Sequence, residues 1–328
     1  MNKKLLLAAA AGLCCAGAQA QSSVSLYGLI DASVVSAKGP GASVTTTAVQ
    51  SGNMTTNFWG MRATEDLGGG LKAEATLEGF FLGTNGASGR FPGDPFFSRG
   101  ANVSLSGGFG TVALGRVTNS LFVNNLIFNA FGDSFGFSPA IRLLHLSAGQ
   151  ASGDTGWNES IKWTSPSIQG ATFSIHQSPK GSRAGSNMNV SALYFRGPIS
   201  AGASWQEVRS RNGGGVGATD SNAWQIGGAY DAKVVKVFAQ VGKVENVTNK
   251  VDYDHMGVGA SVPVSAAGKV LLQYNSMEPS NAKASKTTSV GYDHFLSKRT
   301  DLYAVYMTEK VPGVSNGNTY GVGVRHRF

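Results

Sequence analysis

Apolar and polar residues alternate along most of the chain after residue 20. The segment VSLYGLIDASV (24–34) has an apolar residue or glycine at every second position, and segments 161–166, 171–177 and 235–244 follow the same pattern. A period of two residues is typical of β-strands whose two faces meet different surroundings. The pattern therefore predicts an all-β protein.

Connections between the alternating segments are of two kinds. Seven are short clusters of Gly, Pro, Asp and Ser suited to tight turns, at 65–70, 106–110, 165–170, 196–198, 230–233, 263–269 and 294–299. Eight are longer and polar, near 36–54, 83–98, 119–156, 179–186, 210–219, 245–251, 279–283 and 311–317. Together they predict sixteen strands, most of them about nine to twelve residues long.

An even number of such strands, with short turns at one end and long loops at the other, is the pattern of a transmembrane β-barrel of an outer membrane. Strands of about 9–11 residues match a tilted bilayer crossing, and closure leaves no strand edge unpaired in hydrocarbon. Barrels of about sixteen strands enclose an aqueous channel. The sequence predicts a 16-stranded antiparallel transmembrane β-barrel over residues 21–328.

The N-terminus predicts secretion. Lys3 and Lys4 precede an apolar run, and AQA at 18–20 fits a cleavage site, so residues 1–20 are predicted to be a signal peptide. Both cysteines, Cys14 and Cys15, leave with it, so the mature chain would contain no thiol for a disulfide or a metal. The net charge of +8 falls to +6 when the two lysines are removed.

Several classes of protein are disfavoured. No apolar run after the signal reaches the ~18 residues of a membrane helix, and the basic residues form no stripe that would suit nucleic acid. The five histidines have no metal-ligand spacing, and no cofactor motif occurs. GDSFG (132–136) matches the G-x-S-x-G motif of serine hydrolases formally, but it lacks the strand before and the helix after Ser134 that the motif needs.

Four segments carry a family resemblance: SSVSLYGLIDAS (22–33), GMRATEDLGGGLKAEATLEG (60–79), ANVSLSGGFGTVALGR (101–116) and LSKRTDLYAVYM (296–307). They resemble the Gram-negative general porins, most of all the trimeric, often anion-selective branch of the β-proteobacteria, which the GVRHRF ending also fits. The resemblance implies a homotrimer with one pore in each subunit and a long third loop folded into the barrel. The connection at about 119–156, with five phenylalanines, stands where that loop belongs.

The resemblance also implies arginines on the barrel wall at the constriction. Arg99 matches one of them, although strict alternation would turn it away from the lumen unless the strand contains a bulge or begins late. The two other positions hold Phe58 and Gly156, so the usual arginine ladder is incomplete.

Other charged residues are candidates for the constriction. Arg62, Lys72, Glu74 and Lys162 fall on the polar phase of their strands, as does Glu78, which matches an acidic wall position of the family. The third loop adds Asp133, Arg142 and His145. Basic groups in a narrow pore favour anions, so we expect mild anion selectivity.

The terminal segment TYGVGVRHRF (319–328) is expected to close the barrel against 24–34, with Tyr320 and Phe328 outward and Arg325 and Arg327 in the lumen. The resemblance implies that the barrel-assembly machinery reads Phe328 as an end signal.

The expected function is passive diffusion of small hydrophilic solutes and anions through the outer membrane, among its lipid and lipopolysaccharide, with no nucleic acid partner. Two alternatives stay open: an outer-membrane hydrolase using Ser134, and a non-conducting structural or adhesin barrel.

Overall fold

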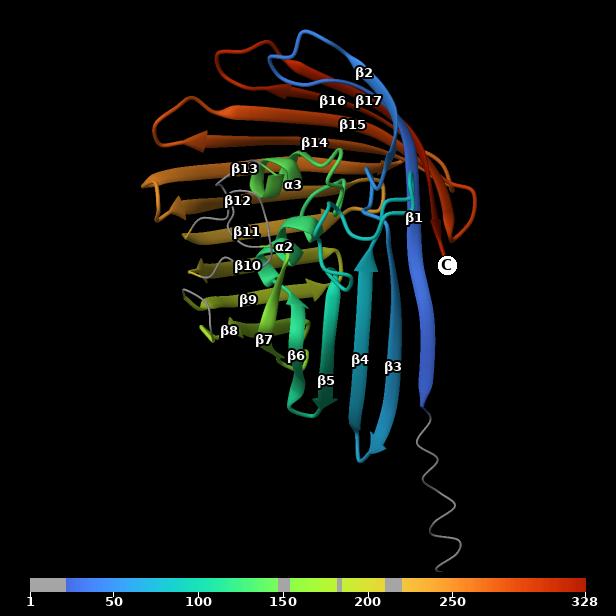
Figure 1. Ribbon diagram of the computed structural model, residues 1–328, viewed down its shortest axis with the longest axis vertical. Helices are drawn as coiled ribbons and strands as arrows, with labels where there is room; N and C mark the ends of the chain where they lie inside the picture. The colour runs from blue at the N-terminus through green and yellow to red at the C-terminus, as the bar shows by residue number, and fades with distance from the viewer. Residues whose placement is uncertain (1–21, 147–153, 182–184, 210–219) are drawn as a thin grey trace, which may run out of the picture.

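The computed structural model describes residues 22–146, 154–181, 185–209 and 220–328, which form one strongly curved antiparallel sheet (Figure 1). The predicted signal peptide, residues 1–20, lies outside the described residues. Among the residues that the structure describes, no helix is long and apolar enough to cross a membrane.

Seventeen strands are assigned within the described residues. They are β1 (Ser23–Lys38), β2 (Thr46–Ser51), β3 (Phe58–Gly68), β4 (Leu71–Phe80), β5 (Gly100–Gly107), β6 (Gly110–Thr118), β7 (Gly156–Thr164), β8 (Ala171–Ser178), β9 (Asn187–Arg196), β10 (Ile199–Val208), β11 (Ser221–Asp231), β12 (Lys236–Asn246), β13 (Val251–Pro263), β14 (Gly268–Pro279), β15 (Ser285–Phe295), β16 (Thr300–Lys310) and β17 (Gly317–Arg327).

The sheet is closed and has sixteen positions around its circumference, as predicted. Apart from β2 and β3, each pair of consecutive strands is antiparallel and hydrogen-bonded, and β1 pairs with β17. Strands β2 and β3 both pair with β1, at different heights, because they are two halves of one barrel strand separated by residues 52–57. Counting these halves as one strand gives the sixteen-stranded barrel.

The first long connection differs from the expectation. Residues 36–54 were predicted to be a loop, but β1 continues to Lys38 and residues 46–51 form β2. The segment TTAVQS is rich in β-branched residues and pairs with the second half of β1. The seven short turns lie where the sequence predicted them, between paired strands.

The two faces of the sheet meet different surroundings. On β11, Trp224 and Ile226 point outward and are 39% and 53% exposed, while Gln225 between them points inward and is fully buried. Exposed apolar side chains recur on the other strands as well, which fits an outward face in contact with lipid.

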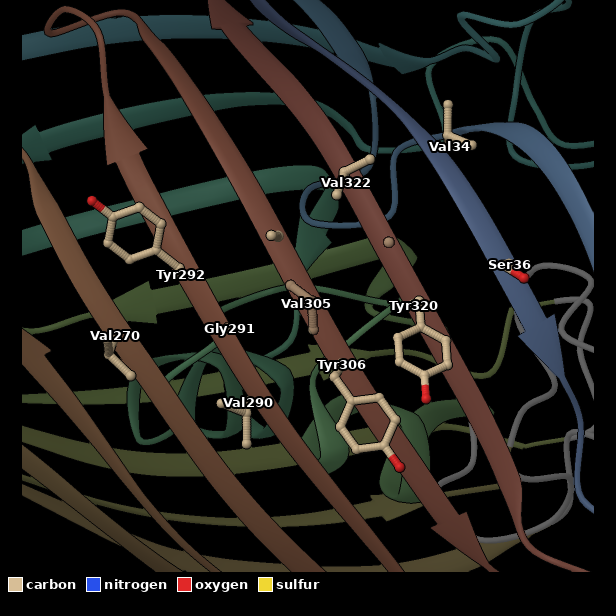
Figure 2. A pocket seen from close by; sticks show the side chains of 12 residues that line it. Val34, Ser36, Val270, Val290, Gly291, Tyr292, Val305, Tyr306, Tyr320 and Val322 are labelled. Carbon is tan, nitrogen blue, oxygen red and sulfur yellow. The ribbon is translucent and has the colours of Figure 1, made fainter.

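The outward face has a hollow across β1 and β14–β17 (Figure 2). Val290, Tyr292, Tyr306 and Val322 border it, around the small side chain of Ala304. The lining is almost entirely apolar, as expected for a surface buried in hydrocarbon or against another apolar surface.

Strand β17 closes the barrel as predicted, with the C-terminus beside β1 in Figure 1. Asp31 is paired with Arg325, and Leu29 with Arg327. The backbone of Phe328 exchanges two hydrogen bonds of 3.1 Å with Gly28, and its ring lies over that glycine. Arg325 and Arg327 point inward, where both contact Asp301 at 2.7 Å. The last residue therefore completes the pairing of β1 with β17, which is called the seam here.

Deleting Phe328 removes the last two backbone hydrogen bonds of the seam and the ring over Gly28. We expect the amount of folded, heat-modifiable barrel in outer membranes to fall severalfold, measured by gel shift after cell fractionation. Phe328→Tyr, which keeps the backbone and the ring, serves as the control and is expected to assemble normally. Normal assembly of the truncated chain would contradict this role.

Candidate functional site

The third long loop, residues 119–155, folds into the barrel. It contains α2 (Ser120–Ile127), α3 (Pro139–Ile141) and the short π-helix η1 (Arg142–Leu146). Asn119 caps α2 by accepting a 2.8 Å hydrogen bond from the backbone N–H of Phe122. Helix α2 contacts β9, β10 and β11, and α3 contacts β14 and β15, so the loop crosses the inner wall (Figure 1). The predicted inward-folded loop is confirmed; its residues 147–153 lie outside the described part.

Three phenylalanines of this loop sit on glycines of the wall. Phe128 covers Gly227, where an added Cβ would lie 2.4 Å from its ring, and Phe137 covers Gly321 at the same distance. Phe131 lies on Gly291. A side chain at these glycines would collide with the rings, so the missing Cβ atoms set how closely the loop approaches β11, β15 and β17.

Polar contacts secure the same side of the loop. Ser289 on β15 donates a 2.7 Å hydrogen bond to the carbonyl of Phe137, and the backbone N–H of Ala130 donates to Gln273 on β14 at 3.0 Å. The loop is therefore attached to the half of the barrel formed by β9–β17. The charged inner faces of β3 and β4 are the other half of the candidate site.

Arg62, Lys72 and Glu74 meet on that opposite wall. The guanidinium of Arg62 lies 3.3 Å from the Glu74 carboxylate, and the Lys72 amine lies 3.9 Å from it. The side chains of Arg62 and Lys72 are about half exposed, at 48% and 52%. The sequence placed all three on the polar phase of β3 and β4, and the structure brings them together as a solvated group.

Arg99 and Glu78 form a second group with two residues that sequence reasoning did not assign to the site. Arg99 stands just before β5 and lies 3.3 Å from Glu78, so the late strand start that it needs to reach the lumen is present. Tyr27 donates a 2.7 Å hydrogen bond to Glu78. The Arg99 guanidinium carbon lies 4.0 Å from the centre of the Phe58 ring, a cation–π contact.

Phe58 thus has a role at the position where the family resemblance led us to expect an arginine. It adds no charge but supports the guanidinium of Arg99 from one face. The alternation of β3 put Phe58 on the lumen side, which was the available signal; its contact with Arg99, from a different strand, needed the fold.

Asp133 lies at the tip of the third loop, beside the β2–β3 junction. The Thr55 hydroxyl approaches its carboxylate at 3.4 Å. Burial raises the pKa of Asp133, and the positive charge of Arg99 partly offsets this rise. The contact with Thr55 places the loop tip beside residues 52–57, next to the start of β3.

Arg142, His145 and Lys162 lie elsewhere. Arg142 donates to Glu309 on β16 at 2.8 Å, which anchors the loop to the wall on which it rests. The Lys162 amine donates to the carbonyl of Thr118 at 3.1 Å. His145 packs edge-on against Phe122, and burial, with a smaller contribution from His255, lowers its pKa to about 4.

A third cluster, centred on Asp154, joins the base of the third loop to the loop between β4 and β5. Arg90 contacts Asp154 at 2.9 Å and Asp94 at 2.8 Å, and Arg116 on β6 contacts Asp154 as well. Arg116 also donates to the carbonyl of Gly156 at 3.1 Å. Sequence reasoning missed this cluster because its members come from two loops and from β6, which are far apart in the sequence. The guanidinium of Arg116 thus lies next to Gly156, the other position at which an arginine was expected.

Ser134 is fully buried and its hydroxyl is used for structure. It donates to the carbonyl of Asn53 at 2.7 Å and accepts from the backbone N–H of Phe137 at 2.9 Å. No strand precedes it directly and no helix begins at the next residue, so the geometry of a nucleophile elbow is absent. In the part of the chain that the structure describes, no three His, Cys, Asp or Glu residues gather as a metal site.

Comparisons with known proteins agree with this architecture. A family model described as Gram-negative porin matches residues 6–313. The outer membrane porin protein 32 of Delftia acidovorans is 33% identical over 92% of this chain and 88% of its own length. An outer membrane porin protein of Bordetella pertussis is 28% identical over the full length of both chains.

Among solved structures, an anion-selective porin from Comamonas acidovorans superposes with a TM-score of 0.81. It is 27% identical to this chain, and the match covers 94% of this chain and 100% of that one.

The contact between Phe128 and Gly227 provides a test of how the loop is held. Gly227→Ala puts a methyl group where the ring lies, so we expect L3 (residues 119–155) to shift toward β3–β5 and single-channel conductance to fall. Overpacking of this kind costs about 1–3 kcal/mol of stability. Gly228→Ala is the matched control, because its nearest neighbour would be 3.6 Å away. Equal conductance in the two variants would contradict the proposed contact.

Proposed function

Because the chain belongs to the family of Gram-negative porins, we propose that the β3–β5 wall and the tip of L3 form the constriction of a mildly anion-selective channel. The chain is an outer-membrane porin: its sixteen-stranded barrel encloses a water-filled channel through which small hydrophilic solutes and ions diffuse. The proposal concerns the residues that give this channel its preference.

The charges of the wall support a weak preference for anions. The groups around Glu74 and Glu78 contain three cations, Arg62, Lys72 and Arg99, against two carboxylates, which leaves one positive charge. A positive potential in a narrow, water-filled passage raises the local concentration of anions. Because the excess is a single charge, and because the carboxylates lie beside the cations, the preference is mild. The solved relative from Comamonas acidovorans is itself described as anion-selective.

Three other candidate residues contribute less to the preference, namely Arg142, Lys162 and Asp133. Arg142 is tied to Glu309 and Lys162 to a backbone carbonyl, so neither is a free charge at the constriction. Asp133 is the one acidic group of the set on the loop side, and its raised pKa makes it less negative as the pH falls. Anion preference should therefore rise slightly under acidic conditions.

We propose a homotrimer, with an independent pore in each subunit, as the family resemblance implies. The apolar outward residues of β1, such as Val24 and Leu26 at 76% and 65% exposure, supply a surface for lipid or for another subunit. Lipid and lipopolysaccharide of the outer membrane, and the barrel-assembly machinery, complete the proposed partners. Closure of the conductance in three equal steps would support the trimer.

No catalytic step belongs to this proposal. Ser134, the residue on which a hydrolase would depend, is buried with its hydroxyl engaged on both sides. A porin moves solutes down their gradients, so neither a cofactor nor an energy source is required.

The selectivity is tested by the reversal potential of the refolded protein in a planar bilayer under a salt gradient. Arg99→Gln should shift this potential toward cation preference, because Glu78 then keeps its charge without its partner. One charge about 6 Å from the ion path is worth about 0.7 kcal/mol in water, or roughly a threefold change in the permeability ratio. Arg196→Gln removes the same charge from the exposed end of β9 and should leave the potential unchanged.

Raised salt should diminish the difference between the two variants, since charges are screened over ~10 Å at 0.1 M. A wild-type channel that clearly prefers cations would overturn the proposed selectivity. A refolded barrel without conductance would instead favour a structural or adhesive role.

A further inference from the structure

The second barrel strand is interrupted by residues 52–57, between β2 and β3, and this segment is called the β2–β3 break here. Strand β1 pairs with β3 up to Leu29 and with β2 from Ala32 onward. Asp31 lies in the gap between the two pairings. Its backbone N–H donates to the Asn57 side chain at 2.6 Å, and its carbonyl accepts from Gly52 at 2.9 Å. Asp31 therefore contacts both ends of the break.

The side chain of Asp31 holds the middle of the same segment. One carboxylate oxygen accepts the backbone N–H groups of Met54 and Thr55, at 2.7 and 2.8 Å. The other accepts the hydroxyl of Tyr303 on β16 at 2.5 Å. Asp31 has no exposed surface, so these donors take the place of water around its carboxylate.

The β2–β3 break also receives the tip of L3. The carbonyl of Asn53 accepts hydrogen bonds from Ser134 and from the backbone N–H of Gly136, at 2.7 and 2.9 Å. A Cβ on Gly136 would lie 2.6 Å from the Asn53 side chain, so the fit is close. The Met54 side chain belongs to the same buried cluster as Phe131 and Phe137.

Contacts made by Tyr303 and Arg325 connect the β1–β17 pairing with the break and with L3. Tyr303 packs against Phe137 with its ring, at 6.1 Å between centroids, while its hydroxyl binds Asp31. Arg325 on β17 donates to the Thr55 hydroxyl at 3.1 Å. The receptor for the loop tip is thus built from β1, the β2–β3 break, β16 and β17, the strands that meet only when the barrel closes.

We propose that Asp31 is a positioning residue for the constriction: it fixes the β2–β3 break and through it holds the tip of L3 against the wall. This proposal rests on the channel function proposed above, because its effect on conductance presupposes a conducting pore. It also makes docking of L3 dependent on closure of the seam, so the constriction forms after the first and last strands have paired.

The test compares Asp31→Asn with Asp301→Asn in the full-length protein. Both aspartates have no exposed surface, but Asp301 lies on β16 and its carboxylate contacts Arg325 and Arg327 rather than the break or L3. An asparagine at position 31 has one acceptor oxygen where the carboxylate has two. Its NH₂ group would face either the N–H groups of the break or the Tyr303 hydroxyl.

The first measurement follows the docking of L3 by proteolysis and does not depend on channel conductance. Arg142 is the single Lys or Arg between residues 119 and 155, so the rate of tryptic cleavage after it reports how often L3 leaves the wall. Charge-assisted hydrogen bonds are among the stronger ones, so we expect Asp31→Asn to raise this rate about tenfold. Asp301→Asn should change it less than about twofold, because Asp301 itself contacts neither L3 nor the break, and Arg325 keeps its contacts with Asp293 and Thr55. An equal rate in wild type and Asp31→Asn, or an equal rise in both variants, would overturn the proposal.

Single-channel recording then gives the functional readout. Asp31→Asn should raise the occupancy of reduced-conductance substates about tenfold, in proportion to the cleavage rate, while leaving the reversal potential unchanged because the wall charges are intact. Tyr303→Phe removes only the hydroxyl that binds Asp31 and is the second variant, used if Asp31→Asn does not fold. It should raise both the cleavage rate and the substate occupancy, by a smaller factor than Asp31→Asn. Unchanged cleavage and substates in Tyr303→Phe would also contradict the proposal. A wild-type protein that docks L3 but does not conduct would refute the channel function alone.

Discussion

Pairing of every backbone N–H and C=O group within the sheet is the constraint on which this structure depends. In hydrocarbon an unpaired group costs several kcal/mol, so the strands must close on themselves. The pairing of β1 with β17 supplies that closure and extends to the last residue, where Phe328 and Gly28 exchange two hydrogen bonds. Closure at sixteen strands also leaves a lumen too wide for wall side chains alone to fill.

L3 narrows that lumen by crossing from the β9–β17 wall to the β2–β3 break. Its phenylalanines rest on glycines of β11, β15 and β17, and its tip rests on the β2–β3 break, so the loop is fixed by packing against a complete wall. On the opposite wall, β3–β5, the side chains of Arg62 and Lys72 are about half exposed, whereas Arg99 and its partner Glu78 are more covered. Width and charge preference are therefore set by different residues, and substitutions on one wall should affect one property more than the other.

Much of the fold could be predicted from the sequence because a strand records its two environments locally, residue by residue. Alternation indicated the sixteen strands and the inward phase of Arg62, Lys72 and Glu74, which the structure brings together. Contacts between distant segments left no such local pattern. Glu309 is 167 residues from Arg142, and nothing near Arg142 indicated that its side chain would be held in an ion pair.

Strand β2 was missed because a short strand between two irregular segments resembles part of a loop. Phe58 shows the same limit: from the sequence it was a missing charge, whereas in the fold its ring supports Arg99, the wall arginine that is present.

The central claim, that the inner face of β3 lines a water-filled constriction, is tested most directly by thiol modification. Both cysteines lie within residues 1–20, so the mature chain offers no competing thiol once the proposed signal peptide is removed. Arg62→Cys and Met61→Cys place a thiol on adjacent residues of opposite faces. The account predicts that a bulky methanethiosulfonate reagent lowers the current through Arg62→Cys and leaves that through Met61→Cys unchanged. Equal sensitivity of the two variants, or no block of Arg62→Cys, would contradict it.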